Sequence, residues 1–211
     1  MNITILLYAG FTALDCIGPY ELLSRIPGAR VRFVAKKAGP VKADTGMLTV
    51  LAEESIRDTA APDILLIPGG PGDEAAYADD ETVEWVARVH ETTKWTTSVC
   101  TGSLVLGAAG LLKGLDATTH WANAARLEAF GARYAAQRVV RRGKIVTAAG
   151  VSAGIDMALT LVAAEVGDDF AKALQLGIEY DPQPPFDCGS PAKAPAPLRE
   201  MVLMTMAASR L

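Results

Sequence analysis

Residues 94–110, KWTTSVCTGSLVLGAAG, join a short strand pattern to a helix of small residues with no loop between them. The strand pattern ends at Val99 and the helical pattern begins at Thr101, so Cys100 falls on the corner between the two. A side chain at such a corner is held in a tight turn above the carboxyl edge of a sheet. The N–H groups of the following helix favour a thiolate there. We therefore predict that Cys100 is a nucleophile; the alternative is a buried structural cysteine.

Short apolar runs alternate with helical patterns along the rest of the chain, which predicts an α/β sheet with helices on both faces. A hairpin is expected over 39–50, and a helix over 20–25 with Pro19 at its start. The absence of a linker indicates one domain over residues 1–211. A proline-rich extended segment is expected at about 181–197, followed by a C-terminal helix near 197–210. The predicted strands are 3–8, 31–36, 63–67, 94–99, 116–119, 134–140 and 144–148.

Composition excludes several classes of function. Half of the 211 residues are hydrophobic and a fifth are charged, and the net charge is −4, which argues against nucleic acid or an anionic membrane surface as partner. The N-terminus lacks the pattern of a secretion signal, and no apolar run is long enough to span a bilayer. The three cysteines, Cys16, Cys100 and Cys188, are widely spaced, which suggests free thiols in a reducing, cytoplasmic compartment. No His/Cys cluster has metal-ligand spacing, so no metal site is expected.

A second motif, Pro68-Gly69-Gly70-Pro71-Gly72, follows the strand at 63–67. Neighbouring parallel strands end at the same edge of a sheet, so this loop is expected beside Cys100. Glycine N–H groups there, above all that of Gly70, could join the N–H of Thr101 in holding a developing negative charge. An ordinary glycine turn is the alternative. The motif lacks the spacing of a phosphate-binding loop.

Two further side chains are candidates for the same edge. Asp15 follows the first strand, where it could cap the next helix or serve as an acid or base facing Cys100. His120 could pair with the thiol, but we favour a place in the wall of the pocket. Trp121 and Val151 are candidates for an apolar part of that wall.

Together these segments resemble the PfpI-type superfamily, which has a class I glutamine-amidotransferase-like fold and a nucleophilic cysteine elbow. Within it they are most similar to the isocyanide (isonitrile) hydratases. The protease-like and glyoxalase-like branches carry a His directly after the nucleophile or a Glu in place of Asp15, and this chain has neither. The resembling stretches are LDCIGPYELL (14–23), LLIPGGPG (65–72), TSVCTGSLVLGAAGLL (97–112), ATTHWA (117–122), AGVSAGIDMALTL (149–161) and LQLGIEYDPQPPFDCGSP (174–191).

This resemblance implies a flavodoxin-like core, a homodimer and no cofactor. It places the nucleophile at Cys100, its neighbouring threonine at Thr101 and the catalytic aspartate at Asp15. The implied reaction is that of a lyase, the hydration of an isocyanide to an N-substituted formamide. Cys100 would attack the terminal carbon while Asp15 supplies its proton, giving a thioimidate that water then attacks. The amides of Thr101 and Gly70 would matter mainly in that second step.

Two other functions remain open. The ligand-sensing domains of AraC-type regulators share the fold, but they are followed by a DNA-binding helix-turn-helix region, whereas this chain ends at Leu211 after one expected helix. Another thiol enzyme of the superfamily, glyoxalase-like or a stress protein, is the second alternative.

Overall fold

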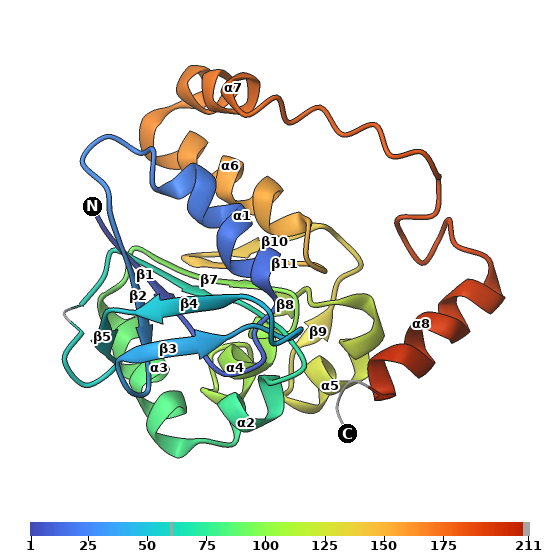
Figure 1. Cartoon of the computed structure of the whole chain (residues 1–211), viewed down its shortest axis with the longest axis horizontal. Coiled ribbons are helices and arrows are strands. Elements are labelled where there is room, and N and C mark those ends of the chain that lie inside the picture. The colour runs from blue at the N-terminus through green and yellow to red at the C-terminus, as the bar shows by residue number, and fades with distance from the viewer. Residues whose placement is uncertain (60, 209–211) are drawn as a thin grey trace.

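A seven-stranded sheet forms the centre of the protein in a computed structural model that describes residues 1–59 and 61–208 (Figure 1). The strand order is β10-β11-β7-β6-β1-β2-β5, and every neighbouring pair is parallel except β10 with β11. This confirms the predicted mostly parallel α/β sheet. The strands are β1 (Asn2–Leu6), β2 (Arg30–Ala35), β5 (Glu54–Ser55), β6 (Ile64–Ile67), β7 (Trp95–Val99), β10 (Val139–Arg142) and β11 (Ile145–Ala148).

Helices cover both faces of the sheet, as the alternating pattern predicted (Figure 1). The two-residue period of β6 places Ile64 and Leu66 in one hydrophobic core and Leu65 and Ile67 in the other. β6 is buried on both faces and is apolar throughout, as is typical of strands in parallel sheets. One side carries α1 (Ala13–Leu23) and α6 (Ala153–Val166), with α7 (Asp168–Gly177) packed on α6; the other carries α2 (Asp73–Tyr77), α3 (Asp80–Thr92), α4 (Gly102–Ala108) and α5 (Ala124–Ala129).

Smaller elements decorate the sheet. The expected hairpin is present as the antiparallel pair β3 (Gly39–Lys42) and β4 (Thr49–Ala52). A short parallel pair, β8 (Asp116–Ala117) with β9 (Arg133–Tyr134), and a 3-10 turn, η1 (Trp121–Asn123), lie between α4 and β10.

The first helix begins earlier than the sequence predicted. Pro19 lies inside α1 instead of at its start, and Thr12 is the N-cap residue. The reason is tertiary packing: a Cβ on Gly154 of α6 would lie 3.0 Å from the Pro19 ring, so the two helices are in close contact there. Such contacts override a weak helix propensity. Asp15 consequently lies in the first turn of α1 and does not cap it.

The strand-to-helix corner has the predicted form. β7 ends at Val99, and α4 begins at Gly102 with Thr101 as its N-cap residue. Cys100 between them has a φ of 56°, in the left-handed region that residues with a side chain seldom adopt. A Cβ on Gly102 would lie 2.1 Å from the Ile67 carbonyl oxygen, so only glycine allows α4 this close to β6.

The C-terminal part of the chain leaves the sheet. Residues 181–195 contain no helix or strand and lead to α8 (Ala196–Ala208), the red helix in Figure 1. Positions 209 and 210, where the sequence predicted more helix, lie outside the described residues. Across the residues that the structure describes, every helix is too short or too polar to cross a membrane.

Replacing Gly102 by alanine should disrupt the corner. The added methyl group would meet the Ile67 carbonyl, and relief requires a backbone shift that costs roughly 3 kcal/mol of unfolding free energy. Gly177→Ala is the matched control, because no atom lies within 4 Å of its added Cβ. That substitution, at the end of α7, should be neutral or stabilising by about 0.5 kcal/mol. Urea unfolding of both variants tests this, and equal stabilities would contradict it.

Candidate active site

Cys100 is fixed by its backbone on both sides. Its N–H donates to the carbonyl oxygens of Ala148 (3.0 Å) and Ala149 (3.1 Å) at the end of β11. Its own carbonyl accepts the hydroxyls of Ser103 and Thr119, each at 3.0 Å. These bonds stabilise the left-handed conformation, which holds the side chain on the corner above the sheet edge.

Asp15 lies beside Cys100 and is fully buried. Its Oδ2 accepts the N–H of Gly69 at 2.9 Å, and Oδ1 has no hydrogen-bond partner of ordinary geometry among the described residues. Burial raises the pKa of this carboxyl to about 7, whereas the Gly69 N–H and the Cys100 thiol lower it and the charge of Asp44 raises it. The carboxyl can therefore gain or lose a proton near neutral pH.

The surroundings of the Cys100 sulfur favour a neutral thiol in the resting site. Burial, and then the neighbouring Asp15, raise the pKa of the thiol well above its ordinary value. The backbone N–H groups of Thr101 and Val151 donate to the sulfur and lower the pKa. The predicted effect of the helix N-terminus is thus present but smaller than desolvation. A thiol and a carboxyl in this relation can exchange one proton between them.

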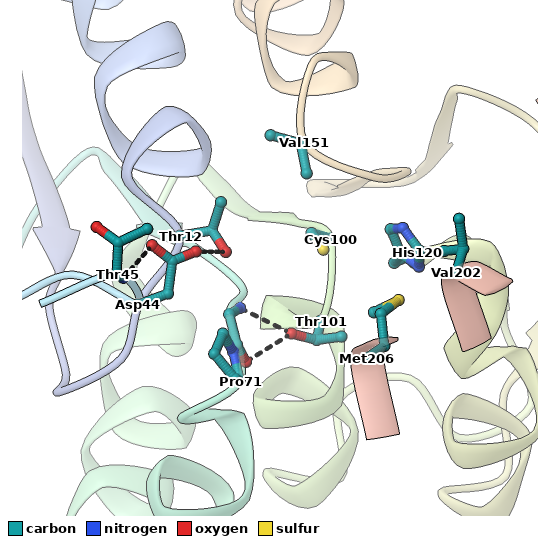
Figure 2. Close-up of a pocket in the computed structure, with 11 residues that line it drawn as sticks. Thr12, Asp44, Thr45, Pro71, Cys100, Thr101, His120, Val151, Val202 and Met206 are labelled. Carbon is teal, nitrogen blue, oxygen red and sulfur yellow. Dashed lines mark hydrogen bonds between the residues drawn. The ribbon is translucent and has the colours of Figure 1, made fainter. Parts of the chain in front are cut away.

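The glycine loop holds the site together through its amides. Gly69 donates to Asp15. The N–H of Gly70 donates to Thr101 Oγ1 at 2.9 Å, and the dashed lines at Thr101 in Figure 2 mark the bonds between these two residues. The Thr101 hydroxyl donates back to the Gly70 carbonyl at 3.3 Å. The sequence predicted that the Gly70 N–H points at a ligand, and this prediction was wrong. In the structure this N–H donates to the Thr101 hydroxyl. A Cβ on Gly69 would lie 2.4 Å from the Thr101 nitrogen, so the loop and the corner are in direct contact.

A cavity of about 480 Å³ opens beside Cys100, a volume typical of small-molecule sites (Figure 2). Four predicted residues line it with Cys100, namely Gly70, Thr101, His120 and Val151. Asp15 is not part of the lining. Pro71 lies in the glycine loop that was expected beside Cys100, whereas the sequence did not indicate Thr12, Asp44, Thr45, Val202 or Met206.

Of the two aromatic candidates His120 and Trp121, only His120 lines this cavity. His120 also lines a neighbouring cavity of about 660 Å³, to which Trp121 belongs. The N–H of Ala122 donates to His120 Nδ1 at 3.3 Å, so this nitrogen serves as a cap of η1. Trp121 therefore lies in the adjoining space and does not line the cavity above the thiol. No group of three or more His, Cys, Asp or Glu side chains within 1–59 and 61–208 is arranged to hold a metal ion.

Some site residues carry no signal in the sequence. Val151 has a φ of 38°, a rare conformation for a β-branched residue, and this directs its N–H at Cys100. The sequence pattern suggested only an apolar side chain there. Val202 and Met206 come from α8, about a hundred residues after Cys100, and no local spacing links them to the corner.

Several known proteins are similar to this chain in sequence or in structure. An isonitrile hydratase from Pseudomonas putida is 43% identical over 93% of this chain and 86% of its own length. The transcriptional regulator CdhR from Pseudomonas aeruginosa is 28% identical, over 79% of this chain but 51% of its own length. The crystal structure of a ThiJ/PfpI family protein from Pseudomonas syringae superposes with a TM-score of 0.94 at 40% identity, and it covers 99% of this chain and 87% of its own.

A protein-family model also matches this chain. Residues 1–164 match the model of the DJ-1/PfpI family, and this stretch includes the whole seven-stranded sheet and the Cys100 corner. The match spans more than half of the chain, so this protein belongs to the DJ-1/PfpI family.

Proposed function

We propose that this protein is a lyase that hydrates isocyanides to N-substituted formamides. The observation that carries the proposal is the buried pair of Cys100 and Asp15, whose carboxyl has a pKa of about 7. The similarity to the isonitrile hydratase of Pseudomonas putida supports the choice of substrate. An isocyanide carbon needs both a nucleophile and a proton, and this pair supplies one of each.

In the proposed first step the thiol proton of Cys100 passes to the Asp15 carboxylate. Asp15 then donates this proton to the terminal carbon of R–N≡C while the thiolate forms a bond with the same carbon. The product is a thioimidate, R–N=CH–S–Cys100, and Asp15 is again a carboxylate. The N–H groups of Thr101 and Val151 stabilise the transient thiolate.

In the second step Asp15 removes a proton from a water molecule that attacks the thioimidate carbon, and Asp15 then passes this proton to the substrate nitrogen. Collapse of the tetrahedral intermediate breaks the C–S bond, returns a proton to Cys100 and releases R–NH–CHO. In the net reaction R–NC and one water molecule give R–NH–CHO. Thr101 and Gly70 line the cavity at this point and are proposed to contact the intermediate, with His120 and Val151 as the wall.

We further propose a homodimer in the cytoplasm. Large apolar side chains are exposed on the β3–β4 hairpin and on α7, among them Met47, Leu51 and Leu176, and such surfaces favour association. Three free cysteines favour a reducing compartment. Light scattering at micromolar concentration should give the mass of two chains, and the mass of one chain would contradict the dimer.

A regulatory function has weaker support. The CdhR regulator matches this chain along about half of the regulator's length. A sensing domain would bind its ligand without turnover, which the assay below distinguishes from catalysis.

Purified protein should convert cyclohexyl isocyanide to N-cyclohexylformamide, and Cys100→Ala should lower kcat/KM by a factor of at least about 1,000 because the covalent route is lost. Cys188→Ala is the matched control, since this thiol is exposed on the 181–195 segment. Mass spectrometry of the product gives the readout. A wild-type protein that is inert to isocyanides would refute the function, and lactate formation from methylglyoxal would favour a glyoxalase-like enzyme.

The pH dependence of kcat/KM should follow the titration of the Asp15 carboxyl. Below pH 7 both groups of the pair hold protons and no thiolate can form, so kcat/KM should rise with pH through about 7. Asp15→Asn should lower kcat/KM at least about 100-fold and remove this acidic limb. If the residual activity of Asp15→Asn still shows an acidic limb with the same midpoint, that limb reports the titration of a group other than Asp15.

Stability should depend on pH through the same carboxyl. Its pKa is raised in the folded state, so the folded protein binds the extra proton and stability falls as pH rises from about 4 to about 7. Asp15→Asn lacks this penalty and should be more stable than wild type by roughly 3 kcal/mol at pH 8, with little difference at pH 4. Asp168→Asn, on the exposed surface of α7, controls for the loss of one charge. Denaturant unfolding at both pH values measures the difference.

A further inference from the structure

The last helix of the chain contributes to the cavity above Cys100. Val202 and Met206 of α8 line it opposite the loop that carries Pro71, as Figure 2 shows. The two residues are four positions apart and therefore lie on one face of the helix. Met206 is half-buried, whereas Met204, two positions earlier, has 74% of its surface exposed.

This helix does not complete either hydrophobic core. None of its described residues is buried, and it is joined to α7 through residues 181–195, which contain no regular structure. Val202 and Met206 place this helix against the cavity. A helix placed in this way adds little to the stability of the sheet but closes one side of the site.

A carboxylate, that of Asp44, lies on the other side of the cavity. Asp44, the acidic residue of the lining, accepts the Thr12 hydroxyl at 2.9 Å and the N–H of Thr45 at 2.8 Å. Figure 2 shows these three residues on the opposite side of Cys100 from Val202 and Met206. Among the residues that the structure describes, the lining contains no lysine or arginine side chain. An anionic substituent would meet a carboxylate there, with no compensating cation from the described lining.

We propose that Val202 and Met206 determine the substrate range of the site, which takes uncharged isocyanides with branched or cyclic apolar substituents. This inference rests on the proposed function. An isocyanide is linear at its N≡C group, so with its carbon at the Cys100 sulfur the substituent projects into the cavity. Contact with the two α8 side chains removes apolar surface of the substituent from water, and this gain grows with its size.

Kinetics with two substrates separate this role from a structural one. Met206→Ala should lower the ratio of kcat/KM for cyclohexyl isocyanide to that for methyl isocyanide about tenfold, mainly through a higher KM for the larger substrate. Val202→Ala should act in the same direction. Met204→Ala, the same change on the exposed face of α8, should leave the ratio at the wild-type value. Met206→Leu, which keeps the volume, should restore the ratio to within about twofold.

Charge selection is tested separately. Asp44→Asn should raise kcat/KM for isocyanoacetate relative to cyclohexyl isocyanide about fivefold at low ionic strength, with the difference shrinking in high salt. An unchanged relative rate for isocyanoacetate would overturn the part of the proposal that excludes anions.

The proposal and the function on which it rests fail in different ways. Equal substrate ratios for Met206→Ala and Met204→Ala in an active hydratase would refute the role of α8 alone. If the wild type hydrates no isocyanide, the proposed function is refuted. The rate of Cys100 alkylation then tests whether the α8 side chains limit access to the thiol. Met206→Trp should slow labelling by N-cyclohexylmaleimide at least about fivefold more than labelling by N-methylmaleimide. Equal slowing of the two reagents would overturn the inference.

Discussion

The interaction on which the site depends is the burial of the Asp15 carboxyl against the Gly69 N–H, next to the Cys100 thiol. A carboxyl without a cationic partner and away from water keeps its proton to a higher pH, and its presence also keeps the thiol protonated. At neutral pH the thiol therefore holds its proton beside a carboxyl that titrates near 7 and can receive it. This arrangement requires three segments to lie together: the glycine loop, the first turn of α1 and the corner after β7. Gly69 joins them, because its N–H donates to Asp15 and its Cα lies close to the Thr101 nitrogen.

Holding these groups together costs stability that the two cores on either side of the sheet offset. Cys100 and Val151 both occupy the left-handed region, and Asp15 is buried with one oxygen unpaired among the described residues. Each departure of this kind costs on the order of 1–3 kcal/mol. Strand β6 is apolar on both faces, and β1 and β7 beside it are almost fully buried, so the packed centre of the sheet supports the strained edge.

The parts of the fold that could be predicted are those set by local pattern. The step from β7 to α4 without a loop placed Cys100 correctly on a corner, and the apolar runs gave the parallel strands. The start of α1 was wrong because packing between Pro19 and Gly154 is a tertiary contact. The pairing of the Gly70 N–H with the Thr101 hydroxyl, the amide direction at Val151 and the side chains of α8 also depend on segments far apart in the chain. No residue spacing encodes them.

The attachment of α8 through residues 181–195 has a consequence for how such a site can diversify. Because this peptide adds no strand to the sheet and α8 buries no residue in a core, its sequence is under weak constraint from folding. The chemistry near Cys100, in contrast, is tied to the centre of the sheet. Reaction and selectivity are therefore encoded in separable segments, and exchanging a terminal peptide would give an existing catalyst a new range of substrates.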